Sequence, residues 1–304
     1  MMNQINNTSL FRWASLLMVV ILLSACSTTR NLPDGEVLYT GIRKIAIQNE
    51  DSTKAGQAAL EEIEAALAYP PNNAIFGSSS LRTPFPFGLW IYNGFVNKKS
   101  KFGKWIFNKL AAKPVLISTV SPDVRTKVVQ NLLHEYGYFN GTASYSVLLD
   151  KKDSLKAKVS YQIDMRQPYK IDTVIYTSIS PKADSIVRQT LAERAIRPND
   201  NFSVIKLEEE RQRLASIMRN KGYYYFRPDF IAYQADTLNY PGRVGLKVIS
   251  KPGLPATAVR PWHVGNISYS LNGYDGETPT DSILYKDLMI YYEGKLRVRP
   301  RILY

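Results

Sequence analysis

The fold of this chain is decided by two matching stretches, His134-Glu-Tyr-Gly-Tyr-Phe139 and Arg219-Asn-Lys-Gly-Tyr-Tyr224. Each stretch comes at the end of an amphipathic pattern, so we expect its glycine to end a helix and its aromatic residues to open the next strand. One Gly-Tyr-aromatic triplet is a weak signal. Two triplets at the same point of successive β-α-α-β-β patterns indicate an internal duplication.

The first pattern surrounds Gly137. A strand is predicted over 42–48 and a helix over 53–67, and Ser121 is the expected cap of a second helix with proline at its first position. The apolar stripe expected on that second helix consists of Val124, Val128 and Leu132. Strands are predicted over 139–149 and 155–165, and in the latter apolar and polar residues alternate.

The second pattern repeats this order. It predicts a strand over 171–176, a helix over 182–195, a helix capped by Ser203, and strands over 223–233 and from Val244. A third unit begins at Val264 and is not completed. The expected fold class is therefore α+β, with tandem β-α-α-β-β units that are each a small three-stranded sheet covered by two helices.

These patterns divide the chain into five expected parts. A signal peptide covers 1–25, and a linker covers 26–36. A first unit covers 37–167, with an insertion or long loop over 70–114 that is rich in proline, glycine and aromatic residues. A second unit covers 168–255, and a partial third unit covers 262–304.

The amino terminus is typical of a bacterial lipoprotein signal. Arg12 precedes a short apolar core, Leu16–Leu23, and small residues lead to Cys26, the only cysteine. The apolar core is shorter than the about 20 residues that a membrane span needs. A plain anchor helix is the alternative. Lipid on Cys26 would hold the chain to a membrane and leave no thiol for a disulfide.

The chain is basic, with a formal net charge of +13 at pH 7. An exported lipoprotein seldom meets nucleic acid, whereas anionic lipid head groups lie beside its anchor. We therefore expect no nucleic-acid partner and a membrane surface close by.

The lipoprotein signal followed by these units resembles the POTRA domains of the outer-membrane assembly family, which includes the barrel-assembly machinery and the translocation and assembly module. Further similarity to lipidated, TamA-like members from Bacteroidetes lies in Pro71–Gly77, Leu89–Asn93, Lys113–Val115 and Leu296–Arg301. Family members continue into a membrane β-barrel, and the chain ends at Tyr304 inside the third unit, so we expect it to be a fragment.

Catalysis has little support in the sequence. His134 and His263 have no cysteine nearby and no metal-ligand spacing, so we expect no metal site and no histidine-based triad. Glu208–Glu210 is interpreted as a solvated helix face that pairs with neighbouring arginines. We expect no cofactor and no enzymatic activity.

The expected binding sites are two edge strands, because an edge strand accepts an extended segment of another chain through its backbone. The resemblance implies that the second strand of each unit is this edge. Its residues would be Ser144, Tyr145, Ser146, Val147, Leu148 and Leu149 in the first unit, and Phe230, Ile231, Ala232, Tyr233 and Gln234 in the second. A strand that only completes its sheet is the alternative for each.

A membrane-contact segment is expected between Trp90 and Lys113, where lysines alternate with aromatic residues and no acid intervenes. The residues assigned to it are Trp90, Phe95, Lys98, Lys99, Lys101, Phe102, Lys104 and Trp105. The alternative is that these aromatic residues pack onto the first unit.

These features together predict a lipid-anchored outer-membrane protein on the periplasmic face. The resemblance implies that its partners are unfolded outer-membrane protein clients and an inner-membrane TamB-like protein. The alternative function is a structural tether that holds an envelope complex at the membrane without binding clients.

Overall fold

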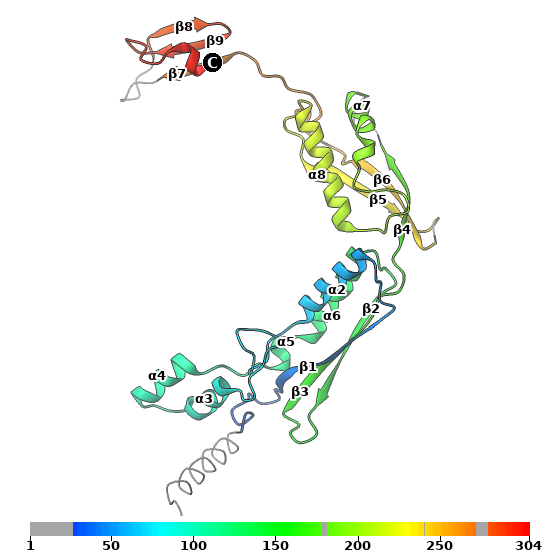
Figure 1. The fold of residues 1–304 in the computed structure, drawn as a ribbon, viewed down its shortest axis with the longest axis vertical. Helices are drawn as coiled ribbons and strands as arrows, with labels where there is room; N and C mark the ends of the chain where they lie inside the picture. The colour runs from blue at the N-terminus through cyan, green and yellow to red at the C-terminus, as the bar shows by residue number, and fades with distance from the viewer. Residues whose placement is uncertain (1–26, 178–180, 240, 272–278) are drawn as a thin grey trace, which may run out of the picture. The chain divides into compact units, whose positions relative to one another are not determined.

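A computed structural model describes residues 27–177, 181–239, 241–271 and 279–304 (Figure 1). The predicted signal and Cys26 lie outside these residues. The described chain divides by its internal contacts into two compact bodies, whose bounds differ from those of the β-α-α-β-β units. The first holds the residues up to Thr173 with Pro198–Lys206 and Asp236–Gly245, and the second holds Val174–Arg197, Leu207–Ala235 and Leu246–Tyr304. None of the described helices is long and apolar enough to cross a membrane.

The first sheet has the strand order β1-β3-β2. Strand β3 (Lys156–Asp164) lies in the middle, parallel to β1 (Leu38–Gln48) and antiparallel to β2 (Thr142–Leu149). The predicted alternation holds along β3, where Ala157, Val159, Tyr161 and Ile163 are buried. Such an alternation gives a sheet one core face and one solvated face.

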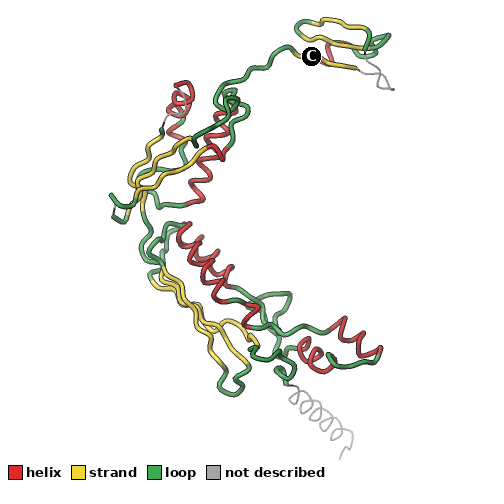
Figure 2. Tube along the Cα trace, turned by 180° about the vertical axis from the view of Figure 1, so that it is seen from behind, coloured by secondary structure: helices red, strands yellow, loops and turns green. Residues whose placement is uncertain are grey.

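Helices α2 (Lys54–Leu67) and α6 (Pro122–Glu135) cover the core face of this sheet (Figure 2). Thr53 caps α2 by accepting the N–H of Gly56 at 3.1 Å. Every buried residue of this core lies between Tyr39 and Met165. A polypeptide that begins at Ser27 therefore contains the whole core.

Two expectations for α6 were wrong. Ser121 is left-handed, with a φ of 48°, and its hydroxyl donates to the Ser118 carbonyl instead of capping α6. The buried stripe of α6 is made by Val129 and Leu133, whereas Val124 and Val128 are exposed. The helix is therefore turned by one residue from the face that the valine spacing suggested.

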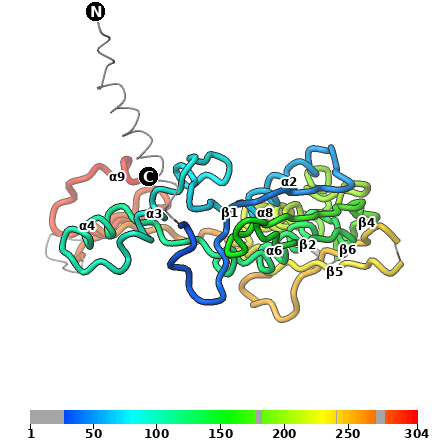
Figure 3. Tube along the Cα trace, turned by 90° about the horizontal axis from the view of Figure 1, so that it is seen from below, coloured from blue at the N-terminus to red at the C-terminus, as the bar shows by residue number. Residues whose placement is uncertain are grey.

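The segment 70–114 is not a plain loop. It contains α3 (Phe87–Phe95) and α4 (Lys101–Leu110), and the short α5 (Ile117–Val120) follows. Helices α3 and α4 run beside each other (Figures 1 and 3). Helix propensity did not predict these two helices, because they contain glycine, which disfavours a helix unless packing compensates.

The second sheet has the order β4-β6-β5, made of β4 (Lys170–Tyr176), β6 (Arg243–Ser250) and β5 (Ile231–Asp236). Its helices are α7 (Pro181–Gln189) and α8 (Val204–Asn220). The predicted helix over 182–195 ends early, and the 3-10 turn η1 (Leu191–Glu193) follows it. Ser203 accepts the Lys206 N–H at 3.4 Å, as expected of a cap.

The two matching stretches end α6 and α8 in the same way. Gly137 and Gly222 have φ of 88° and 93°, and the following tyrosine N–H reaches back to Leu133 (2.8 Å) and to Met218 (3.0 Å). This is the Schellman arrangement, which needs a left-handed residue that only glycine adopts freely. Each glycine carbonyl also accepts an N–H from the start of the next unit, that of Tyr169 (2.9 Å) or Trp262 (2.7 Å).

The third sheet repeats the strand order as β7-β9-β8, made of β7 (Ile267–Leu271), β9 (Leu288–Tyr292) and β8 (Asp281–Tyr285). Strand β9 is parallel to β7 and antiparallel to β8, as β3 is to β1 and β2. In the part of the chain that the structure describes, its only helix is the four-residue α9 (Pro300–Leu303). The fold is α+β, with two complete β-α-α-β-β units and this third sheet.

Candidate functional site

The outer strand β2 is the candidate binding edge of the first unit. It pairs with β3 on one side only, from Thr142 opposite Asp164 to Leu149 opposite Ala157. The predicted residues 144–149 all lie within it. An outer strand leaves half of its backbone groups without a strand partner, and these can bind another chain.

The register identifies which backbone groups point outward. The Asp150 N–H donates to the Lys156 carbonyl at 2.8 Å, so Asp150 belongs to a hydrogen-bonded pair. Such pairs alternate along an antiparallel ladder, so the N–H groups of the odd-numbered residues of β2 point away from β3. Ala143 agrees, because its N–H donates to the Gln130 side chain at 3.2 Å. The outward N–H groups that follow belong to Tyr145, Val147 and Leu149.

The same three residues carry the exposed apolar side chains of β2. They are paired with Tyr161, Val159 and Ala157, which are buried in the core face of β3. The core face therefore continues onto β2 and becomes exposed there. Outward backbone groups and apolar side chains thus lie on one strip, which suits an extended chain of alternating character.

Helix α6 packs beside β2 and contacts its first residues. Its Gln130 holds Ala143 and also donates to the Gly141 carbonyl at 2.7 Å. Val124 and Val128 of the same helix are exposed. The spacing of these two valines had predicted them on the buried stripe of α6 and not at the surface.

On the opposite face of the sheet a shallow groove of about 360 Å³ crosses all three strands. Its polar lining includes Arg43 and Lys44 from β1, Ser144 and Ser146 from β2, and Gln162 from β3. Its only charged lining residues are basic. On the core face, the Tyr161 hydroxyl is buried without a hydrogen-bond partner among the described residues, and burial raises the pKa of this tyrosine.

The predicted edge of the second unit is less open. Strand β5 begins at Ile231, because Phe230 ends the 3-10 turn η2 (Pro228–Phe230). Ile231 is buried, and the Tyr233 hydroxyl donates to the Leu207 carbonyl of α8 at 2.7 Å. Burial and the nearby Glu210 carboxylate raise the pKa of Tyr233. The side chains of β5 therefore pack within their own unit, whereas those of β2 are more exposed and more available to another chain.

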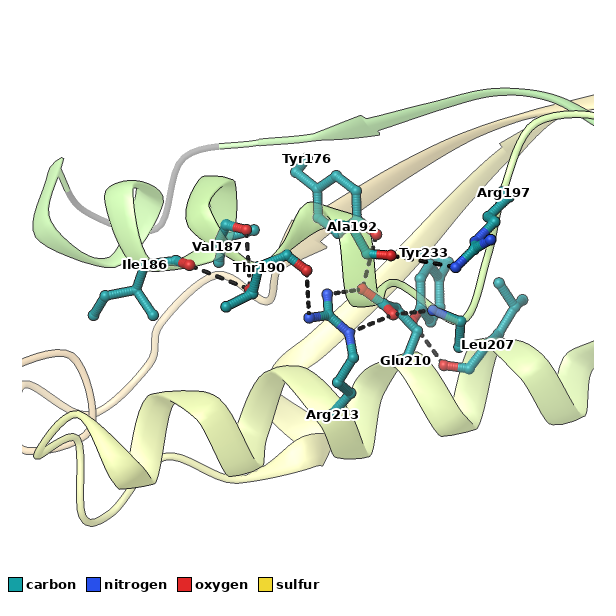
Figure 4. Close-up of polar contacts among 11 residues, drawn as sticks. Tyr176, Ile186, Val187, Thr190, Ala192, Arg197, Leu207, Glu210, Arg213 and Tyr233 are labelled. Carbon is teal, nitrogen blue, oxygen red and sulfur yellow. Dashed lines mark hydrogen bonds and ion pairs between the residues drawn. The ribbon is translucent and has the colours of Figure 1, made fainter.

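Glu210 contradicts the interpretation of Glu208–Glu210 as a solvated face. It is fully buried, and its carboxylate accepts bonds from Arg213 Nε (2.9 Å), the Tyr176 hydroxyl (2.8 Å) and the Ala195 N–H (2.8 Å) (Figure 4). Burial and the Glu210 carboxylate raise the pKa of Tyr176. Burial by itself lowers the pKa of Arg213, but its bonds to Glu210 raise it above the ordinary value.

This network is structural in character. Both Glu210 oxygens are occupied, and Arg213 Nη1 donates to the Thr190 carbonyl at 3.1 Å, so α8 is tied to the turn after α7 (Figure 4). A cavity of about 260 Å³ lies beside it, lined mainly by apolar side chains such as Val187, Leu191 and Leu214. Within the described ranges no cluster of metal-ligating residues occurs.

The residues predicted for membrane contact lie on α3, α4 and the turn between them. Phe102 and Trp105 are exposed and stack on each other, with ring centroids 6.3 Å apart. Trp90 is half-buried and packs on Phe85 at 5.4 Å, and Phe95 is also half-buried. The four lysines at 98, 99, 101 and 104 are exposed.

No protein-family model and no curated protein matches the chain. Among solved structures, it is similar to POTRA domains 3–5 of BamA from Haemophilus influenzae, with 10% identity over 80% of this chain and 73% of that one and a TM-score of 0.34. It is also similar to POTRA domains 1–3 of Omp85 from Anabaena, with 16% identity over 89% and 76% and a TM-score of 0.28.

A third similar structure is BamA from Haemophilus ducreyi lacking POTRA domains 1–3, with 9% identity over 70% of this chain and a TM-score of 0.35. The chain spans 29% of the length of that structure. All three TM-scores are below 0.5, so the fold assignment rests on the strand orders and helices described above. The two complete units have the β-α-α-β-β order that the sequence predicts, and the structure adds that the third strand lies in the middle of each sheet.

Proposed function

We propose that this chain is a non-enzymatic component of outer-membrane protein assembly that binds extended polypeptide segments in the periplasm. Its anchor would be lipid on Cys26, as the amino-terminal sequence predicts. Its clients would be unfolded outer-membrane proteins, and an inner-membrane TamB-like protein would be a second partner. The assignment to TamA-like lipoproteins of Bacteroidetes is part of this proposal and derives from the sequence resemblance.

The observation that carries the proposal is the strip on β2. Tyr145, Val147 and Leu149 offer outward backbone groups and exposed apolar side chains at the same positions. A client strand that alternates between apolar and polar residues would pair with the backbone and place its apolar residues on this side. Backbone pairing makes few sequence demands, which suits a receptor for many clients.

Replacing Val147 by proline tests the edge. Proline removes an outward N–H while the bonds to β3 stay in place, and edge strands tolerate it for this reason. We expect a synthetic ten-residue peptide of alternating character to bind the Val147→Pro variant at least about threefold more weakly, from the loss of one backbone bond. Fluorescence anisotropy of the labelled peptide gives the affinity.

Val147→Thr is the matched control, because it keeps the N–H and the β-branched shape, and it should bind as the original chain does. Circular dichroism checks that both variants are folded. Equal binding by the proline variant and the original chain would leave β2 as a strand that only completes its sheet. That result would favour the structural tether.

A further inference from the structure

Helices α3 and α4 form a defined hairpin with an inner and an outer side. Tyr92 of α3 and Phe107 of α4 meet with ring centroids 5.5 Å apart, and the Ala112 N–H donates to the Gly88 carbonyl at 2.9 Å. Ser100 caps α4 by accepting the Gly103 N–H at 3.1 Å. These contacts fix which side chains of α4 face outward.

The outer side of α4 exposes large aromatic residues. Phe102 is 70% exposed and Trp105 is 57% exposed, and the two rings lie nearly parallel at 16°. Leu110 at the end of the helix is also exposed. Aromatic residues of this size are normally buried, so an exposed pair on one helix face indicates a contact with another apolar surface.

The charged residues in the sequence around Phe102 and Trp105 are all basic. No aspartate or glutamate occurs between Ala65 and Pro122, whereas Arg82, Lys98, Lys99, Lys101, Lys104, Lys109 and Lys113 do. None of these lysines forms an ion pair with another described residue. Tryptophan and phenylalanine beside unpaired lysines suit an interface with anionic head groups, in which rings reach the acyl boundary and lysines contact phosphates.

The start of the described chain is fastened to the same hairpin. Asn93, in the last turn of α3, donates to the carbonyls of Ser27 (3.2 Å) and Thr28 (3.1 Å), and Asn31 donates back to the Asn93 carbonyl (3.0 Å). Ser27 directly follows Cys26, the predicted site of lipidation. A lipid on Cys26 would therefore bring α3 and α4 to the membrane surface.

We propose that the α3–α4 hairpin is a second membrane contact, which docks on an anionic lipid surface through Phe102, Trp105 and the lysines around them. The proposal rests on the proposed function in one respect, because the lipid anchor on Cys26 would bring the hairpin to the membrane. The contact itself uses only residues of the hairpin. A lipid surface fits better than a protein partner, because its phosphates match the unpaired lysines of the hairpin and a lipid on Cys26 would hold that surface next to residue 27.

The test uses the unlipidated chain from Ser27 to Tyr304, which retains the whole core of the first unit, so that no acyl chain contributes to binding. We expect it to sediment with vesicles of phosphatidylethanolamine and phosphatidylglycerol and not with vesicles of phosphatidylcholine. Binding should weaken as salt rises. The Phe102→Ser/Trp105→Ser variant and the Lys101→Glu/Lys104→Glu variant should each bind about tenfold more weakly.

Matched controls alter the same kinds of residue outside the hairpin. Leu238→Ser removes another exposed apolar residue, and Lys247→Glu/Lys251→Glu reverses two exposed lysines. Both should bind as the original chain does. Brominated lipid should quench the chain's tryptophan fluorescence, and this quenching should fall in Trp105→Phe.

No binding to anionic vesicles, or equal binding by the hairpin variants and the original chain, would overturn the proposal and leave the aromatic pair to a protein partner. The assay contains no client peptide and no lipid anchor. Its failure would therefore leave the peptide-binding proposal for β2 untouched, and the Val147→Pro result has no bearing on it.

Discussion

At the scale of single residues, Glu210 shows how one carboxylate can differ from its neighbours. Glu208 pairs with Arg211 at the surface (2.8 Å), whereas Glu210 is fully buried and paired with Arg213. The sequence did hold a signal for this difference, because Glu210 lies three residues after Leu207 and four before Leu214, on the apolar stripe of α8. The run of three acids was interpreted by its charge alone, whereas the periodicity of the apolar residues places Glu210 on the buried face.

We predict that Arg213→Met lowers the free energy of unfolding by about 3–5 kcal/mol, because it leaves a buried carboxylate without its counter-charge. Urea unfolding followed by circular dichroism measures the change. Arg211→Met is the matched control on the same helix, and its surface pair should cost less than about 1 kcal/mol. An equal decrease in the free energy of unfolding in the two variants would show that the burial of Glu210 does not make its ion pair more important for stability.

At the scale of secondary-structure elements, the two helix ends at Gly137 and Gly222 are the best-predicted features. Each glycine ends its helix as predicted, but the strands that follow begin at Thr142 and Ile231 and not at the aromatic residues, which lie in turns. Both glycines are left-handed, and both have another residue's backbone close by. A Cβ on Gly137 would lie 2.6 Å from the Phe202 carbonyl oxygen, and one on Gly222 would lie 2.9 Å from that of Trp262. Glycine is needed there for its backbone conformation and for space.

Gly222→Ala should therefore lower the free energy of unfolding by about 1–3 kcal/mol, since a left-handed alanine is strained and its methyl group meets Trp262. Gly253→Ala is the comparison, because Gly253 has a φ of 74° with nothing within 4 Å of an added Cβ. It should cost only the conformational part, about 1 kcal/mol. The contact with Trp262 would be unimportant if both alanines cost the same in thermal unfolding.

Element types were predictable where periodicity was strong and failed where packing competed with propensity. Strand β3 follows its alternation closely, but the valine spacing of α6 selected the wrong face because Val129 and Leu133 offer an equally good stripe. Helices α3 and α4 could not be predicted from glycine-rich sequence. The outward N–H groups of β2 required the register, which no sequence pattern contains.

At the scale of the whole molecule, the third sheet differs from the first two because it lacks two helices over its apolar face among the described residues. The register places Ile267, Tyr269 and Ile283 on the same face as the buried Leu288 and Ile290, yet these three are exposed. In the first unit the matching face lies under two helices. The strand order of the sheet was not expected from the sequence, which predicted only a partial unit.

The exposed apolar residues of this face should bind a hydrophobic dye. We predict that the chain enhances the fluorescence of anilinonaphthalene sulfonate under native conditions and that Ile267→Ser/Ile283→Ser removes much of the enhancement, because exposed contiguous apolar surface is what such dyes detect. Leu284→Ser alters an exposed leucine on the other face of the same sheet and should change little. Undiminished dye fluorescence in the double variant would place the apolar surface elsewhere.

The carbonyls of Gly137 and Gly222 have one more consequence. Each glycine ends the last helix of its own unit, and its carbonyl also accepts an N–H from the start of the next unit, that of Tyr169 or Trp262. The acceptor that holds the connection therefore lies inside the unit that precedes it. A gene segment copied in tandem would bring its own attachment point along, so an array of such units can grow by duplication without evolving a new junction each time.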